Sequence, residues 1–296
     1  MKLFDFFRLY YDPSTIVARL RRDGLLPMAI NCPTCEDLMV DLSVQNQDGL
    51  IFSCNKRSCR KRKSIRTNSF FENSRLSLCE SMLILHLWAK GYTEKLILDD
   101  FHFAKQTVVD WFRFCRDLCM FSFESDNSVI GSPGSVVELG ETLAVKRKNN
   151  QGRILYAGWL FSGIERRNDG QFNCFVRMVY DRSEAHLTHL IWQHVALRTH
   201  IITDGWSAYR NLSLLGYSHS VVIHEQNFVS PADDQVHTQT IEATWSSFKR
   251  FIRSRGSNKG AFHLEYVCEY LFRRKNTDVF SSLLTTIRQK YTFDNS

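Results

Sequence analysis

Residues 200–206 read HIITDGW, a short apolar run that stops at an aspartate and is followed by a glycine. A short run of apolar and β-branched residues that ends at turn-forming residues is typical of a buried strand, here residues 200–203. Asp204 then lies at the carboxyl end of that strand, which is where open α/β sheets bind their ligands. The stretch therefore predicts a buried strand with a candidate functional carboxylate at its end.

The sequence on both sides of this strand alternates between strand-like and helix-like patterns. Four further segments have strand character: residues 136–145, 154–165, 172–180 and 220–224. A turn at residues 168–170 separates the second of these segments from the third. Three segments have helical periodicity: residues 183–195, 237–255 and 262–274. This order predicts an α/β domain with a mixed sheet whose first three strands are antiparallel.

A second candidate carboxylate, Glu242, lies in the first turns of the helical segment 237–255. Asp204 from a strand end and Glu242 from a helix are the minimum that could hold a divalent cation against a phosphate. The alternative is a structural role, in which Asp204 caps the strand end and the helix dipole stabilises Glu242. The two residues alone leave both interpretations open.

The length and composition favour an ordinary folded protein with two domains. The chain has 296 residues, of which 44% are hydrophobic and 23% charged, and this excludes wholesale disorder and a collagen-like or coiled-coil chain. The longest apolar-rich stretch, residues 82–89, is far shorter than the roughly 20 residues that cross a bilayer, so we expect no membrane partner. Charged residues within the first 30 positions argue against a secretory signal, and we expect a reducing, intracellular compartment.

The nine cysteines are then metal ligands, buried apolar residues or reactive thiols, and not a disulfide framework. Cys32 and Cys35 form one close pair, and Cys54 and Cys59 form another. Two such turns can surround one tetrahedral ion with sulfurs roughly 3.5 to 4 Å apart. The spacing predicts a structural zinc site, with free buried thiols as the alternative. A catalytic zinc is not expected because four thiolates leave no open position.

Positive charge is concentrated in two clusters. The net charge is +7, and the first cluster lies close to the second cysteine pair: Lys56, Arg57, Arg60, Lys61, Arg62, Lys63 and Arg66. The second cluster follows a helical pattern late in the chain: Lys249, Arg250, Arg253, Arg255 and Lys259. Of these, Lys249, Arg250 and Arg253 are the candidate DNA-binding residues. Such clusters favour a polyanionic partner, although a run of charge can also be a solvated face.

Residues 76–88, 93–100 and 105–119 have helical patterns joined by short connections. A helix-turn-helix has this organisation, and Lys105, Arg113 and Arg116 on its third helix could then face DNA. Three-helix bundles with other functions share the pattern. The DNA-binding interpretation therefore depends on the rest of the sequence.

Several short motifs, taken in order, resemble one family. They are residues 54–61 (CNKRSCRK), 66–71 (RTNSFF), 107–112 (TVVDWF), 201–209 (IITDGWSAY), 227–229 (NFV) and 237–245 (HTQTIEATW). Together they resemble the Merlin superfamily of DDE transposases and its bacterial insertion-sequence relatives, over about residues 27 to 276. No single motif is specific, whereas their combination and order are.

The resemblance implies a zinc ribbon, a helix-turn-helix and an RNase H-like core in which three acidic residues hold two Mg²⁺ or Mn²⁺ ions that cleave and join DNA strands. By motif, Asp204 would be the second acid and Glu242 the third. With the sequence patterns, the resemblance divides the chain into an N-terminal helical segment (1–26), a zinc ribbon (27–72), a helix-turn-helix region (73–124), a linker (125–135), an RNase H-like transposase domain (136–276) and a C-terminal tail (277–296).

The position of the first acid is occupied by Gly140, which has no ligand atom. In a strand, Glu138 shares the face of position 140 but is displaced by roughly 6.5 to 7 Å. Glu141 points to the other face unless a β-bulge turns it round. We therefore expect a disabled strand-cleavage centre.

Two functions follow. The first is a transposase-derived protein that binds transposon-end DNA without cutting it. The second is an active DDE transposase with a substitute ligand. A zinc-ribbon protein without a nucleic-acid role is a third alternative. For either of the first two, the resemblance implies double-stranded DNA partners (terminal inverted repeats and target DNA), a homodimer or higher oligomer, and a nuclear location in a eukaryote or a cytoplasmic one otherwise.

Overall fold

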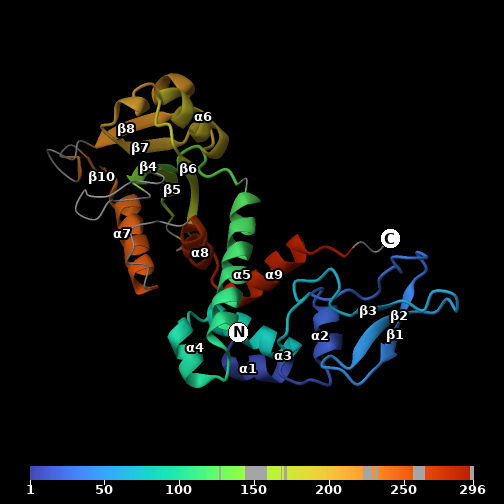
Figure 1. Ribbon diagram of the computed structural model, residues 1–296. Helices are drawn as coiled ribbons and strands as arrows, with labels where there is room; N and C mark the ends of the chain where they lie inside the picture. Colours follow the sequence, from blue (N-terminus) through green and yellow to red (C-terminus); the bar gives the residue numbers. More distant parts are fainter. Residues whose placement is uncertain are drawn as a thin grey trace. The chain divides into compact units, whose positions relative to one another are not determined.

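The computed structural model describes residues 1–126, 128–143, 159–167, 169, 172–222, 229–230, 233–255 and 264–293. The chain divides into two compact units (Figure 1), one comprising Met1–Ser122 with Asn276–Ser296 and the other Phe123–Lys275. The predicted turn at 168–170 and the ends of three predicted strands (144–145, 154–158 and 223–224) lie wholly or partly outside the described residues. Among the described helices, none has the length and apolar character needed to cross a membrane.

The second unit is built on a five-stranded sheet in the order β6-β5-β4-β7-β8. The strands are β4 (Val136–Leu143), β5 (Trp159–Glu165), β6 (Asn173–Val179), β7 (His200–Asp204) and β8 (Ser218–Val222). Antiparallel pairing joins β4 to β5 and β5 to β6, whereas β7 is parallel to β4 and β8 is parallel to β7. The predicted mixed sheet with three antiparallel strands first is confirmed, and this arrangement fits an RNase H-like domain.

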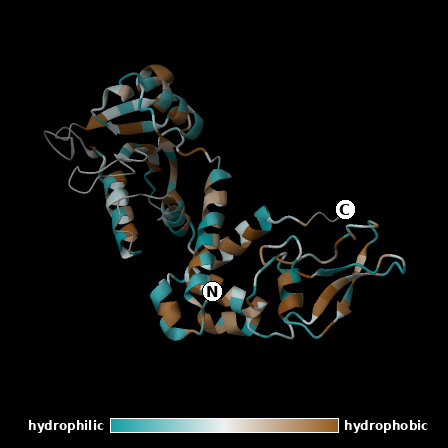
Figure 2. Ribbon diagram, in the orientation of Figure 1, coloured by the Kyte–Doolittle hydropathy of each residue, from teal (hydrophilic) through white to brown (hydrophobic). Residues whose placement is uncertain are grey.

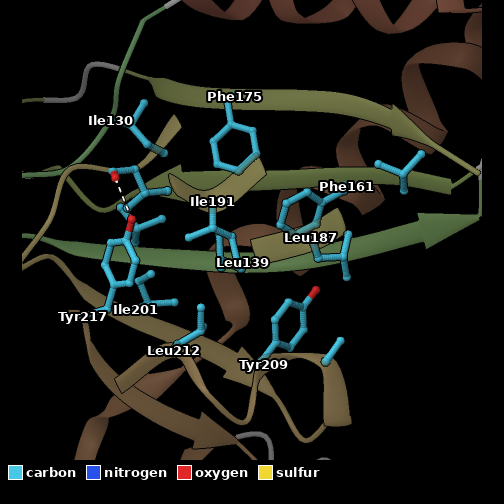
Figure 3. Packing of buried hydrophobic residues seen from close by; sticks show 14 residues of the cluster. Ile130, Leu139, Phe161, Phe175, Leu187, Ile191, Ile201, Tyr209, Leu212 and Tyr217 are labelled. Atoms are coloured by element: carbon cyan, nitrogen blue, oxygen red, sulfur yellow. Dashed lines mark hydrogen bonds between the residues drawn. The ribbon is translucent and has the colours of Figure 1, made fainter. Parts of the chain in front are cut away.

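Helices pack against both faces of this sheet. They are α6 (Glu184–His194), α7 (Gln239–Ser254) and α8 (Leu264–Lys275). Phe161 of β5 lies in a core with Leu139 and with Leu187 of α6 (Figure 3). Its neighbour Leu160 lies in a second core with apolar residues of α7 and α8. Consecutive strand residues point to opposite faces, so this strand is apolar on both sides.

The remaining elements of this unit are short. They are the 3-10 helices η2 (Ser207–Tyr209) and η3 (Leu212–Leu215) and the strand pair β9 (Val229–Ser230) and β10 (Asp233–His237). Both 3-10 helices follow β7, and η2 packs against α6. The end of β7 at Asp204 is therefore followed at once by structured backbone.

The segment predicted as a linker, residues 125–135, is built into the second unit. Ile130 is fully buried in the core on the α6 side, and its backbone pairs with His194 and Ala196. Gly131 has a left-handed backbone (φ 82°), and a Cβ at this position would lie 2.5 Å from Thr199 Oγ1. The boundary between the units consequently lies between residues 122 and 123, before the segment predicted as a linker.

The first unit combines a small sheet with helices. The sheet has the order β1-β2-β3 and consists of β1 (Met39–Ser43), β2 (Leu50–Cys54) and β3 (Arg62–Ser64). The helices are α1 (Leu3–Tyr10), α2 (Ile16–Arg22), α3 (Leu78–Ala89), α4 (Glu94–Asp100), α5 (Lys105–Glu124, whose last two residues belong to the second unit) and α9 (Val279–Lys290). A capping box formed by Ser77 and Glu80 starts α3, which is buried along nearly its whole length. Figure 2 shows hydrophobic and hydrophilic residues together along α5, which has one buried and one exposed face.

Residues 277–296, predicted as a C-terminal tail, instead contain α9, which packs against α3. Phe280, Leu283 and Ile287 are buried on one side of α9. Their spacing of three and four residues is that of an amphipathic helix, which explains why the segment is part of the first unit.

Candidate functional site

Gly140 and Asp204 lie at equivalent positions on adjacent parallel strands. β4 pairs with β7 at Val136 with His200 and at Glu138 with Ile202. Continuing this register by two residues places Gly140 beside Asp204. Neighbours at the same register of parallel strands point to the same face. The position that the resemblance assigns to the first acid thus lies next to Asp204, to which it assigns the second.

The first turn of α7 covers this position. A Cβ added to Gly140 would lie 3.1 Å from Cδ1 of Ile241. The next residue, Glu242, is half-buried, and its Oε1 accepts a hydrogen bond from Thr238 Oγ1 (3.1 Å). The structure therefore brings together the three elements that carry the three motif positions: β4, β7 and the start of α7.

These elements do not present a triad of acids. Among the described residues, the only group of three or more His, Cys, Asp or Glu side chains whose ligand atoms converge is the cysteine cluster of the first unit. Asp204 Oδ1 accepts a hydrogen bond from the backbone N–H of Trp206 (3.1 Å). Asp204 and Glu242 are thus candidate carboxylates that do not belong to a converging group of three such side chains in the described part of the chain.

Both carboxylate oxygens of Glu138 already accept hydrogen bonds from other residues. Its side chain is fully buried; Oε1 accepts a hydrogen bond from Arg166 Nε (2.6 Å), and Oε2 accepts one from the backbone N–H of Ile241 (2.9 Å). His237 Nδ1 lies 3.4 Å from Oε1. The carboxylate thus satisfies a free N–H at the start of α7, where a negative charge is favoured by the helix dipole. As a metal ligand it would have to leave Arg166.

Glu141 lies on the other face of the sheet, as predicted. Its Oε1 accepts a hydrogen bond from the hydroxyl of Tyr209 (2.6 Å), and its Oε2 pairs with Arg182 Nε. Burial, together with the nearby charge of Glu141, raises the pKa of Tyr209. β4 pairs with β5 residue by residue from Val137 to Leu143, so β4 has no bulge that would turn Glu141 toward Asp204.

The four predicted zinc ligands lie together in the first unit. Cys32 Sγ is 3.5 Å from Cys59 Sγ, and Cys35 Sγ is 3.5 Å from Cys54 Sγ. All four sulfurs are within 4.8 Å of one another. A Zn–S bond of about 2.3 Å in a tetrahedron gives a sulfur spacing of roughly 3.8 Å. The donor set and its geometry therefore fit zinc.

Two similar turns present these sulfurs. Glu36 and Arg60, each directly after the second cysteine of a pair, have left-handed backbone with φ of 61° and 49°. The backbone N–H of Thr34, pointing at the Cys32 sulfur, lowers the pKa of that thiol to about 6. Desolvation and hydrogen bonds with the neighbouring sulfurs raise the pKa of Cys35 to about 12 and also raise that of Cys54, so Cys32 is the cysteine whose shift favours the metal-binding thiolate.

Most of the predicted DNA-binding cations are exposed. In the first unit they are Lys56, Arg57, Arg60, Lys61, Arg62, Lys63, Lys105 and Arg113; in the second they are Lys249, Arg250 and Arg253. The prediction is wrong for Arg116, which is 8% exposed because it lies on the buried side of α5. Arg66 is also buried: its guanidinium donates to Asp48 (2.7 Å) and to the carbonyl of Leu76 (2.7 Å), so it is a structural residue.

Sequence reasoning did not single out Arg166, Arg182 or Ile241. Arg166 is 28 residues from its partner Glu138, and Arg182 is 41 residues from Glu141. Pairs so distant leave no local pattern in a single sequence. The alternation of strand residues did place Glu138 on the face of position 140 and Glu141 on the other, but it gave no indication that arginines hold both.

Comparisons with known proteins support the transposase interpretation. Residues 137–275 match the ISXO2-like transposase domain. The chain is also similar to the male abnormal protein mab-31 of Caenorhabditis elegans, at 26% identity over 167 residues that cover 49% of this chain and 38% of that protein. The match thus spans well under half of the length of this curated relative. These similarities support a DDE transposase family and suggest a transposase-derived protein.

Proposed function

We propose that this chain is a transposase-derived DNA-binding protein whose strand-cleavage centre lacks its first carboxylate. The observation that carries the proposal is the place of Gly140, beside Asp204 and in front of Ile241. Of the three acids that the resemblance assigns to two Mg²⁺ ions, Asp204 and Glu242 are present. The donor set is incomplete for that metal pair, and Glu138 and Glu141 are held by arginines.

The exposed cations of α7 support DNA binding by the second unit. Lys249, Arg250 and Arg253 follow Glu242 along the same helix, and residues three and four apart share a helix face. Cations that neutralise DNA phosphates release counterions and make the affinity depend steeply on salt. This stripe could therefore hold a DNA backbone next to Asp204 and Glu242.

The first unit would supply a second contact. Of the exposed cations in the 56–63 segment, Lys56 and Arg57 lie in the Cys54–Cys59 turn, and Arg62 and Lys63 lie on β3, the edge strand of its sheet. We also propose that the four cysteines bind zinc as part of a zinc ribbon. The helices α3, α4 and α5 would act as a helix-turn-helix in which Lys105 and Arg113 face the DNA.

A cleavage assay tests the catalytic part of the proposal. The substrate is DNA carrying the terminal sequences that flank the coding region, incubated with Mg²⁺ or Mn²⁺. We expect no cleavage or strand transfer by the chain as it stands. Cleavage that is lost on Asp204→Ala would overturn the proposal in favour of an active transposase with a substitute ligand.

A binding assay tests the DNA part independently. Affinity for a duplex should fall steeply with salt, and Lys249→Gln/Arg250→Gln/Arg253→Gln should reduce the slope of log K against log salt by about 0.9 for each phosphate that is no longer neutralised. Arg198→Gln/Arg210→Gln, which alters exposed arginines of the same unit outside α7, is the matched control. Equal slopes in all three proteins would exclude the α7 stripe as a DNA-binding surface.

A further inference from the structure

The guanidinium of Arg182 lies between two indole rings at the end of the sheet. Its central carbon is 3.9 Å from the ring centre of Trp159 and 4.4 Å from that of Trp206. Arg182 also forms an ion pair with Glu141, whose other carboxylate oxygen accepts a hydrogen bond from the hydroxyl of Tyr209. Cation–π contacts and an ion pair together fix the orientation of this arginine and of the indoles on either side.

Trp206 is at the same time exposed and tied to the candidate site. Its side chain is 43% exposed, and its backbone N–H donates to Asp204 Oδ1 (3.1 Å). A large aromatic ring in water is unfavourable unless something covers it. Arg182 lies over one face of the ring, and the exposed remainder of Trp206 offers a flat surface two residues along the chain from the carboxylate.

We propose that Trp206 is a stacking platform for an unpaired nucleobase at the end of bound DNA. The inference rests on the proposed DNA-binding function and adds a specificity to it. A nucleobase is the flat, aromatic partner that a DNA ligand brings to Asp204, and stacking on an indole tolerates any base. The bases inside a duplex are already stacked on one another, so only an unpaired base can use this surface.

The arrangement of Arg182 makes Trp206 more than a solvent-exposed side chain. The ring is held before any ligand arrives, so little rotamer freedom is lost on binding. Trp192 provides the contrast within the same unit: it is 65% exposed on α6 and stacks with His189 at 6.5 Å between ring centres. It has no contact with Asp204 among the described interactions.

The test compares two duplexes that differ only in the bases of a short single-stranded end. One carries a thymidine overhang and the other an abasic overhang of equal length, so that the number of phosphates is the same. We expect the full chain to bind the thymidine overhang at least about fivefold more tightly, the lower end of the stacking range. Trp206→Ala should abolish this ratio, Trp206→Phe should retain part of it, and Trp192→Ala should leave it unchanged.

Each outcome separates this inference from the function on which it rests. A blunt duplex measured in parallel shows whether Trp206→Ala is folded and binds DNA. Tight binding of all duplexes by the unaltered chain with a ratio near unity would overturn the stacking platform and leave the DNA-binding function standing. Binding of none of them would overturn the DNA-binding function, and the platform with it. A ratio that persists in Trp206→Ala would assign the base preference to another residue.

Discussion

Ile241 fills the space into which a side chain at position 140 would extend. The distance from a Cβ at Gly140 to Ile241 Cδ1 would be 3.1 Å, closer than ordinary van der Waals contact, and Cγ2 of the same residue would lie at 3.4 Å. Ile241 directly precedes the candidate acid Glu242 and is itself buried. The absence of a side chain at position 140 and the position of this isoleucine are therefore coupled.

Restoring the carboxylate should strain the packing around it. Gly140→Asp is expected to lower the free energy of unfolding by about 1–3 kcal/mol, the usual effect of overpacking a core. Gly140→Ala isolates the steric part of this change. In Gly140→Asp/Ile241→Ala, the loss should be smaller than the sum of the single changes by about 0.5–3 kcal/mol, as for residues in contact. Urea unfolding of the unaltered chain, Gly140→Asp, Ile241→Ala and the double variant measures this coupling, and strictly additive losses would contradict it.

The same double variant should gain a response to magnesium. With Asp at position 140 beside Asp204, and with space made at position 241, Mg²⁺ has a carboxylate pair that the unaltered chain lacks. A ligand that binds only the folded state raises its stability in proportion to RT ln(1 + [L]/Kd), so we expect Mg²⁺ to raise the melting temperature of this variant and not that of the unaltered chain. Gly140→Asn/Ile241→Ala lacks the added carboxylate and is the control. An equal response in both double variants would show that the new carboxylate is not a ligand.

Arg166 should be far more important for stability than its neighbour in sequence. Arg166→Gln leaves the Glu138 carboxylate buried and without its cation, and removing one partner of a buried pair costs about 3–5 kcal/mol. Arg167 pairs with the exposed Asp169 and, at 3.8 Å, with Glu165, and its own side chain is partly exposed, so Arg167→Gln should cost about 0–1 kcal/mol. Chemical unfolding distinguishes the two; similar losses would mean that the Glu138 pair is not a structural requirement at the start of α7.

The cysteine cluster predicts a bound metal that stabilises the first unit. The purified chain should contain zinc at one ion per molecule by elemental analysis, and Cys59→Ser should lose it because three thiolates bind more weakly than four. A strong chelator should unfold the first unit before the second. Cys268→Ser, which alters a buried cysteine of the second unit, is the control and should keep the zinc. A zinc content that is unaffected by Cys59→Ser would place the metal elsewhere.

Periodicity predicted the elements of the second unit because each of its strands and helices buries a face against the sheet or its helices. The sequence missed features that depend on single residues. Residues 125–135 are polar and rich in turn formers, and the one buried apolar side chain, Ile130, has no periodic partner within the segment. Arg116 is different: it lies four residues after Phe112 and three before Cys119, both buried, so helical spacing already indicates the buried side of α5.

The sequence likewise predicted some features of the candidate site and missed others. The strand that ends at Asp204 predicted that the site lies at the carboxyl end of a strand. The alternation of strand residues predicted that Glu138 and Glu141 point to opposite faces of the sheet. The arginines that neutralise both glutamates come from distant segments and became visible only in three dimensions. A single sequence could show that Gly140 has no ligand atom, but not the ion pairs that hold Glu138 and Glu141 in place.

His86 should make the first unit sensitive to mild acid. It is fully buried in α3 and stacks on Phe6 with ring centres 4.5 Å apart, and neither ring nitrogen has a hydrogen-bond partner among the residues that the structure describes. Burial lowers its pKa from 6.5 to about 4. The unfolded chain therefore takes up a proton before the folded one does. Stability is fully present above about pH 6.5 and decreases as the pH falls toward about 4, by up to about 3 kcal/mol.

His86→Phe keeps an aromatic ring against Phe6 and removes the titrating group. Its free energy of unfolding should therefore fall less between pH 6.5 and 4 than that of the unaltered chain. His102→Phe, which alters an exposed histidine of the same unit, is the matched control. Urea unfolding at a series of pH values measures the difference. If His86→Phe and the unaltered chain lose stability in parallel over this range, the acid sensitivity belongs to other groups, because a buried neutral histidine must contribute a slope that its replacement removes.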